Sequence, residues 1–104
     1  MSVASLQWEL EDAMQDFVRA CQQYEDCLHP RTSSLTVDRR AYSAMCDELD
    51  ETRKQRRKAV REIVNQLKAL PGGHGAVTEA RRRLDAWARD NGYQDVLRTY
   101  EPLA

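Results

Sequence analysis

The chain of 104 residues is 41% hydrophobic and 32% charged, with a formal net charge of −1. This length suits one domain with a single core and excludes a two-domain enzyme. No apolar run approaches the roughly 20 residues of a membrane-spanning helix and the first residues lack the basic start of a signal peptide, so we expect one helical domain over residues 1–104 in the cytoplasm.

The first predicted element is an amphipathic helix that begins at Val3 or Ser5 and ends at Leu28. His29 and Pro30 end it, because a residue that precedes proline avoids the α region. Apolar residues recur at spacings of three and four, which predicts one face that packs against the rest of the chain. This buried stripe consists of Val3, Leu6, Leu10, Ala13, Met14, Phe17, Cys21, Tyr24 and Leu28.

Trp8 does not belong to the stripe of the first helix. At about 100° per residue it lies nearly opposite Leu6 and Leu10, in a polar row that faces water or a partner. Large exposed aromatic side chains often mark binding surfaces. We therefore predict a partner-binding surface whose residues are Trp8, Asp12, Gln15 and Arg19.

Residues 30–36 are predicted to connect the first helix to the second, with Ser34 or Thr36 as the N-terminal cap. The second helix is expected to run from Val37 to Leu70, which makes it longer than the first. It ends at the glycine-rich segment 71–75.

The apolar pattern of the second helix fails in its middle, since residues 50–58 contain no apolar side chain. A continuous seam places Thr52 and Arg56 at positions that an ordinary core rejects unless they are paired. The two signs of charge are separated along the chain. Most charged residues among residues 1–30 are acidic, whereas most charged residues among residues 53–83 are basic. We expect the acidic first helix to lie beside the basic half of the second.

The basic residues of the second helix raise nucleic-acid binding as an alternative function. The candidate residues are Arg53, Lys54, Arg57, Lys58 and Arg61. Several of them have acidic neighbours at helical spacing, such as Asp50 and Glu51. The sequence pI of about 6.1 also differs from that of a dedicated nucleic-acid binder, so we do not expect nucleic acid to be the principal partner.

A third, shorter helix is predicted from Ala76 to Asn91, with Gly92 just past its end, and a last helical segment from Tyr93 to Tyr100. The fold class is thus all-α: a long antiparallel two-helix hairpin, a shorter third helix and a short C-terminal helical segment. The apolar stripe of the last two elements is narrow, so we expect a second copy of the chain to cover it. The predicted homodimer interface consists of Leu84, Trp87, Val96, Leu97 and Tyr100.

The three cysteines form an odd set without a paired spacing, so we expect reduced thiols and no intramolecular disulfide. Cys21 and Cys46 are expected in the core. Cys27 and His29 have no second pair of ligands at zinc spacing, and we predict no metal site and no cofactor. We also do not expect an enzyme. The carboxylates are predicted to lie on solvent-facing sides of helices, and both histidines, His29 and His74, are predicted to lie in loops.

The segment LQWELEDAMQDFV at residues 6–18 forms an N-terminal amphipathic helix that resembles that of the QslA-type quorum-sensing anti-activators. The chain also resembles these proteins in its length and in its all-helical content. The resemblance implies a dimeric cytoplasmic inhibitor that binds the ligand-binding domain of a LuxR-type transcription factor such as LasR. It also implies that binding keeps the receptor from dimerising and holding DNA. From the residues and the resemblance together we predict a small regulatory protein that binds another protein and blocks its assembly or activity.

Overall fold

The computed structural model describes residues 2–29 and 39–104, which form four helices and, within those ranges, no strand. The helices are α1 (Val3–Leu28), α2 (Arg39–Lys68), α3 (Gly73–Asn91) and α4 (Gln94–Thr99). The predicted all-α class is confirmed. None of the helices in the described residues is long and apolar enough to cross a bilayer.

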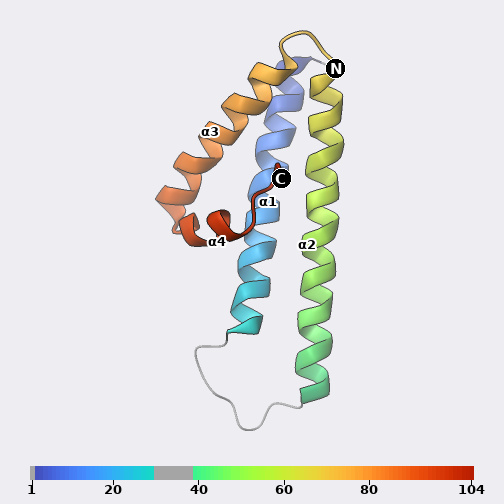
Figure 1. The fold of residues 1–104 in the computed structure, drawn as a ribbon, viewed down its shortest axis with the longest axis vertical. Coiled ribbons are helices and arrows are strands. Elements are labelled where there is room, and N and C mark those ends of the chain that lie inside the picture. The colour runs from blue at the N-terminus through green and yellow to red at the C-terminus, as the bar shows by residue number, and fades with distance from the viewer. Residues whose placement is uncertain (1, 30–38) are drawn as a thin grey trace.

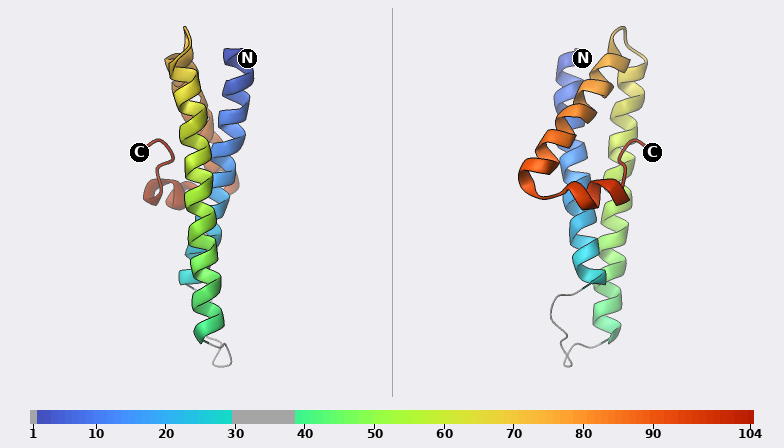
Figure 2. Two further views of the ribbon diagram at one scale, coloured as in Figure 1. Left: turned by 90° about the vertical axis from the view of Figure 1, so that its right-hand side faces the viewer. Right: turned by 60° about the vertical axis from the view of Figure 1, so that its left-hand side comes forward.

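The two long helices α1 and α2 run side by side in opposite directions (Figure 1), and α3 returns against them from the end where α2 stops. The turned views show that α4 then runs across α1 towards α2 (Figure 2). The molecule is elongated, with extents of 55 × 25 × 19 Å. Below α4 in Figure 1, the two long helices continue without a third helix beside them.

The bounds of α1 agree with the periodicity of its sequence. Ser2 caps the helix, because its side-chain oxygen accepts a hydrogen bond from the backbone N–H of Ser5 at 3.1 Å. At the other end, the N–H of His29 donates to the carbonyl of Glu25 at 2.9 Å. The predicted caps of the second helix, Ser34 and Thr36, lie outside the described residues.

Helix α3 begins at Gly73, three residues earlier than predicted. Gly72 adopts the left-handed conformation, with φ of 79°, and its carbonyl accepts the N–H of Ala76 at 3.2 Å. Gly73 lies directly against α2, since a Cβ atom there would stand 1.5 Å from the carbonyl oxygen of Leu67. The glycines therefore form the first turn of the helix, where the sequence suggested only a loop.

The core lies where α3 and α4 cover the α1–α2 pair. Its buried residues come from all four helices. They are Leu6, Leu10, Met14, Phe17, Val18 and Cys21 of α1, Val60, Val64 and Leu67 of α2, Ala76, Val77, Ala80, Leu84 and Ala88 of α3, and Val96 and Leu97 of α4. Pro102 is also fully buried, so the segment after α4 packs on the same core.

Three of the five residues predicted to form the dimer interface are not exposed. Leu84, Val96 and Leu97 are buried within the single chain. Trp87 stacks on Tyr93, with the ring centroids 5.0 Å apart, and the hydroxyl of Tyr100 donates to Glu25. Val96 and Leu97 of the short helix α4 pack on the same core as Leu84, an effect of tertiary packing that periodicity alone does not reveal.

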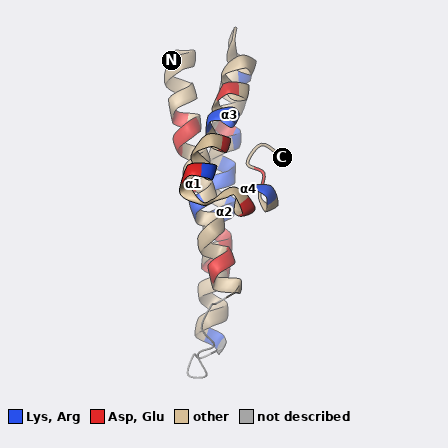
Figure 3. Cartoon of the chain, turned by 90° about the vertical axis from the view of Figure 1, so that its left-hand side faces the viewer, with Lys and Arg blue, Asp and Glu red and all other residues tan. Residues whose placement is uncertain are grey.

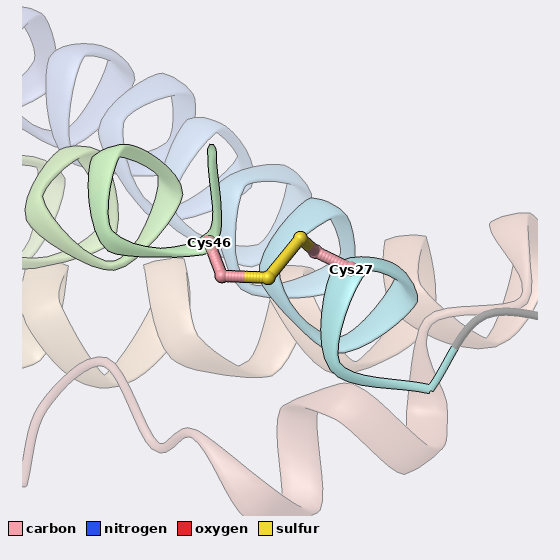
Figure 4. Close-up of a disulfide and its surroundings, with 2 residues drawn as sticks. All are labelled: Cys27 and Cys46. Atoms are coloured by element: carbon pink, nitrogen blue, oxygen red, sulfur yellow. A yellow bond between two sulfur atoms is a disulfide. The ribbon is translucent and has the colours of Figure 1, made fainter. Parts of the chain in front are cut away.

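The prediction of three reduced cysteines was wrong. Cys27 and Cys46 form a disulfide between the end of α1 and the start of α2, with a Cα–Cα distance of 5.9 Å (Figure 4). The two residues are 19 positions apart, and they meet only because antiparallel packing places the end of one helix beside the start of the next. Cys21 is a free, buried cysteine, as predicted.

Candidate interaction surface

Trp8 is the most exposed large hydrophobic residue among those described, with 69% of its surface accessible. Leu6 and Leu10, two positions away on either side, are buried in the core. The indole therefore projects from the side of α1 that faces away from its own core. This confirms the prediction that Trp8 lies off the buried stripe.

The predicted partner-binding residues differ in how free they are. Asp12 is exposed and makes no hydrogen bond or ion pair within the described part of the chain, whereas Gln15 is half-buried. Arg19 pairs with Asp16 at 3.4 Å. Its guanidinium also lies 5.2 Å from the ring centroid of Trp87 in α3, so Arg19 joins two helices of the fold.

The surface around Trp8 is acidic. Glu9 and Asp12, one and four positions along the helix, are exposed, and Figure 3 shows acidic segments in red near the N-terminal end of α1. We call the exposed residues Trp8, Glu9 and Asp12 the Trp8 face. An apolar ring among carboxylates suits a partner with a hydrophobic pocket and a basic rim.

Helix α1 holds the Trp8 face in place from two sides. Its inner side contributes Leu6, Leu10 and Met14 to the core. Glu11, which lies between Glu9 and Asp12 in the sequence, forms an ion pair with Arg83 of α3. The backbone beneath Trp8 is thus fixed before any partner arrives, which lowers the entropic cost of docking.

The acidic helix α1 forms an ion pair with α3, whereas charge complementarity was expected between α1 and α2. The ion pair that links α1 to a basic helix involves α3, through Glu11 and Arg83. The two arginines that precede Arg83 in α3 have partners of their own. Arg81 pairs with Glu101 and Asp85, and Arg82 pairs with Glu79. The hydrogen bond to Glu101 raises the pKa of Arg81, which keeps this side chain charged.

Part of the alternative nucleic-acid surface on α2 is used by the fold itself. Arg53 lies between two aromatic rings, 5.4 Å from the centroid of Tyr24 and 5.2 Å from that of Tyr100. Its side chain is only 16% exposed and pairs with Asp50. Lys54 pairs with the same carboxylate at 3.2 Å.

Two further arginines of this candidate set contact residue 104. Arg57 and Arg61 both donate to the carbonyl oxygen of Ala104, Arg61 at 3.2 Å. Lys58 is exposed. Of the five residues, Arg53 and Arg57 are half-buried, whereas Lys54, Lys58 and Arg61 are exposed.

The middle of α2 thus continues the inner seam with polar residues. Arg53 and Arg57 are partly buried, at a helical spacing that leads on to the buried Val60. Thr52 is also partly covered, and its hydroxyl donates to the carbonyl of Glu48 at 3.0 Å. Arg56, which a continuous seam through the two apolar patches would include, is exposed.

Sequence analysis missed the polar layer that fills this gap. Arg53 of α2 pairs with Asp50 and lies over the rings of Tyr24 in α1 and Tyr100 beyond α4. The hydroxyl of Tyr100 in turn donates to Glu25 of α1. The Arg53 hydrogen bond lowers the pKa of Asp50. Desolvation and the bond to Glu25 raise the pKa of Tyr100. No sequence signal indicated that these residues meet, because they come from three separate segments.

No group of three or more metal-binding side chains is placed to hold an ion among the described residues. His29 is exposed and lies 3.7 Å from the carboxylate of Glu25. Comparisons with known protein families, with curated proteins and with solved structures find no match to this chain.

Proposed function

We propose that this protein is a protein-binding regulator that docks through the Trp8 face. The observation that carries the proposal is the 69% exposure of Trp8 on a helix whose opposite side is fully packed. Large buried tryptophans are frequent hot spots of protein interfaces, each contributing about 2 kcal/mol or more to binding.

The partner has a hydrophobic pocket for the indole and basic residues at its rim. Glu9 and Asp12 supply the negative charge that meets this rim. Charge pairs at the edge of an interface contribute mostly to the rate and orientation of association. The indole supplies most of the affinity, together with one N–H donor that requires an acceptor in the pocket.

The narrower proposal is that docking inhibits the partner by competitive occlusion. Where the partner uses the same pocket for its own assembly, the indole of Trp8 and that assembly exclude each other. The resemblance of residues 6–18 to quorum-sensing anti-activators supports a LuxR-type transcription factor as such a partner. The exposed indole supports a hydrophobic pocket on the receptor.

The test is direct binding of the purified chain to a LuxR-type ligand-binding domain, measured by calorimetry. Trp8→Ala is expected to weaken binding about thirtyfold, which corresponds to about 2 kcal/mol. Met45→Ala is the matched control, because Met45 is also an exposed apolar residue, 49% accessible, but lies on α2. The control is expected to bind like the unmodified chain.

Two outcomes separate the general proposal from the narrow one. If the receptor domain does not bind but another purified partner binds in a Trp8-dependent manner, the LuxR-type assignment is wrong and the docking proposal stands. If a verified partner binds Trp8→Ala as tightly as the unmodified chain, the docking proposal itself is wrong.

A further inference from the structure

The disulfide lies outside the main core of the molecule. The core cluster ends at Cys21 on α1 and begins at Val60 on α2. Between these residues and the disulfide lies the polar layer around Arg53. Cys27 and Cys46 are themselves buried, with 6% and 8% of their surface exposed.

Most side chains at the start of α2 are exposed. Of residues 40–48, only Cys46 is buried and only Tyr42 is half-buried, while the remaining side chains are exposed. Helices α3 and α4 lie higher along the pair and do not flank this end (Figure 1). Within the described residues, the covalent bond is therefore the principal buried contact between the two helix ends, which otherwise bury little apolar surface.

The position of Cys27 makes the bond open to exchange. Cys27 is the second-last residue of α1, and Leu28 ends the helix. Terminal turns open at a free-energy cost near zero, so fraying of one turn brings the sulfur within reach of an external thiolate.

The third cysteine does not compete for the bond. Cys21 is fully buried, and desolvation raises the pKa of its thiol to about 12. It is six positions from Cys27 on the same helix and therefore on a different side of it. A neutral, enclosed thiol is a poor nucleophile, so the reductant comes from outside the chain.

We propose that the Cys27–Cys46 disulfide is a redox-sensitive latch that controls the local opening of the ends of α1 and α2. In the oxidised protein the latch couples residues 40–48 to the last turn of α1. In the reduced protein these segments separate, while the core around Phe17 and Val60 stays folded.

The chemistry is thiol–disulfide exchange with a dithiol. One thiolate of the dithiol attacks a cysteine sulfur, and the Sγ–Sγ bond breaks to leave a mixed disulfide and a cysteine thiolate. The second thiolate of the dithiol then displaces the other cysteine. Two electrons pass to the protein, both cysteine sulfurs take up a proton, and the dithiol becomes a disulfide.

The latch is independent of the proposed docking function. Roughly five turns of helix separate Trp8 from Cys27. Failure of one proposal therefore leaves the other unaffected.

Hydrogen exchange of the full chain, with and without dithiothreitol, tests the latch. Thiol titration in denaturant first verifies one free thiol in the oxidised protein and three in the reduced one, as the disulfide and Cys21 require. On reduction, amides of residues 40–48 are expected to exchange about tenfold faster or more, while those of residues 10–18 and 60–67 keep their protection.

Two variants serve as controls. The double variant Cys27→Ser/Cys46→Ser is expected to show the reduced pattern with or without dithiothreitol. Cys21→Ala keeps the disulfide and is expected to respond to dithiothreitol like the unmodified chain. If the double variant does not fold, the reduced unmodified chain supplies the same comparison.

Three results would overturn the latch. Three free thiols after air oxidation would show that the bond does not form. Unchanged exchange after verified reduction would show that other contacts hold the ends together. Loss of protection throughout residues 10–18 and 60–67 would show that the bond supports the whole fold instead of a local opening.

Discussion

The guanidinium of Arg53 lies over the ring of Tyr100, 5.2 Å from its centroid, and so ties α2 to the segment that follows α4. The same side chain covers Tyr24 of α1 and pairs with Asp50. One arginine therefore connects three segments of the chain at the level where the apolar core ends. At this level the space between the helices is occupied by the Arg53 guanidinium, whereas apolar side chains occupy it elsewhere along the seam.

Arg53→Ala is expected to destabilise the protein by about 1–3 kcal/mol, because it removes two ring contacts and one of the two partners of the half-buried Asp50 carboxylate. Arg56→Ala, on the exposed side of the same helix, is expected to change stability by less than about 0.5 kcal/mol. Urea denaturation followed by circular dichroism measures both. Equal effects of the two substitutions would contradict the role assigned to Arg53.

Trp8→Ala is expected to leave the free energy of unfolding within about 0.5 kcal/mol of the unmodified value, as for other exposed positions. Phe17→Ala is the contrasting core substitution, since Phe17 is 1% exposed, and it is expected to cost about 3–5 kcal/mol. Thermal and urea unfolding compare the two. A loss of several kcal/mol in Trp8→Ala would identify the indole as a structural residue.

The glycines at the start of α3 are expected to respond in opposite directions to alanine. Gly73→Ala places a methyl group 1.5 Å from the carbonyl oxygen of Leu67, so the backbone must shift at a cost of about 2 kcal/mol or more. At Gly75 nothing lies within 4 Å of the added atom. Gly75→Ala is therefore expected to stabilise the helix by about 0.5–1 kcal/mol. The melting temperatures of the two variants test this prediction, which requires a lower value for Gly73→Ala and a higher value for Gly75→Ala than for the unmodified chain.

The buried thiol of Cys21 predicts a loss of stability at alkaline pH. Burial raises its pKa from 9.0 to about 12, so above pH 9 the unfolded chain releases this proton while the folded chain keeps it. Stability is then full below the unfolded pKa and falls as pH rises towards the folded one. Cys21→Ala should show a shallower decline of the urea midpoint at alkaline pH. Tyr100, whose pKa is raised by desolvation, contributes a decline that this variant retains.

The helix α1 and the exposure of Trp8 followed from periodicity alone. A single helix determines which of its own sides is apolar, and the stripe through Leu6, Leu10 and Phe17 does lie in the core. The proline after His29 marked the end of the helix for an equally local reason. Local rules suffice where the question concerns one helix.

Contacts between residues of different helices could not be predicted from the periodicity of the sequence. Cys27 meets Cys46, and Arg53 meets Tyr100, only through the register in which the helices pack. The burial of Leu97 depends on the direction in which α4 returns after Gly92, whose φ of 78° turns the chain. None of these relations leaves a periodic trace in the sequence.

The two tryptophans give the protein an internal optical signal for two separate events. Trp8 is largely in water, whereas Trp87 is stacked on Tyr93 and lies beneath the guanidinium of Arg19. Acrylamide should quench the fluorescence of the first indole far more strongly than that of the second. A blue shift of the Trp8 emission then reports docking in a Trp87→Phe variant, and the emission of Trp87 in a Trp8→Phe variant reports unfolding. Binding and folding can thus be followed in the same chain without any attached label.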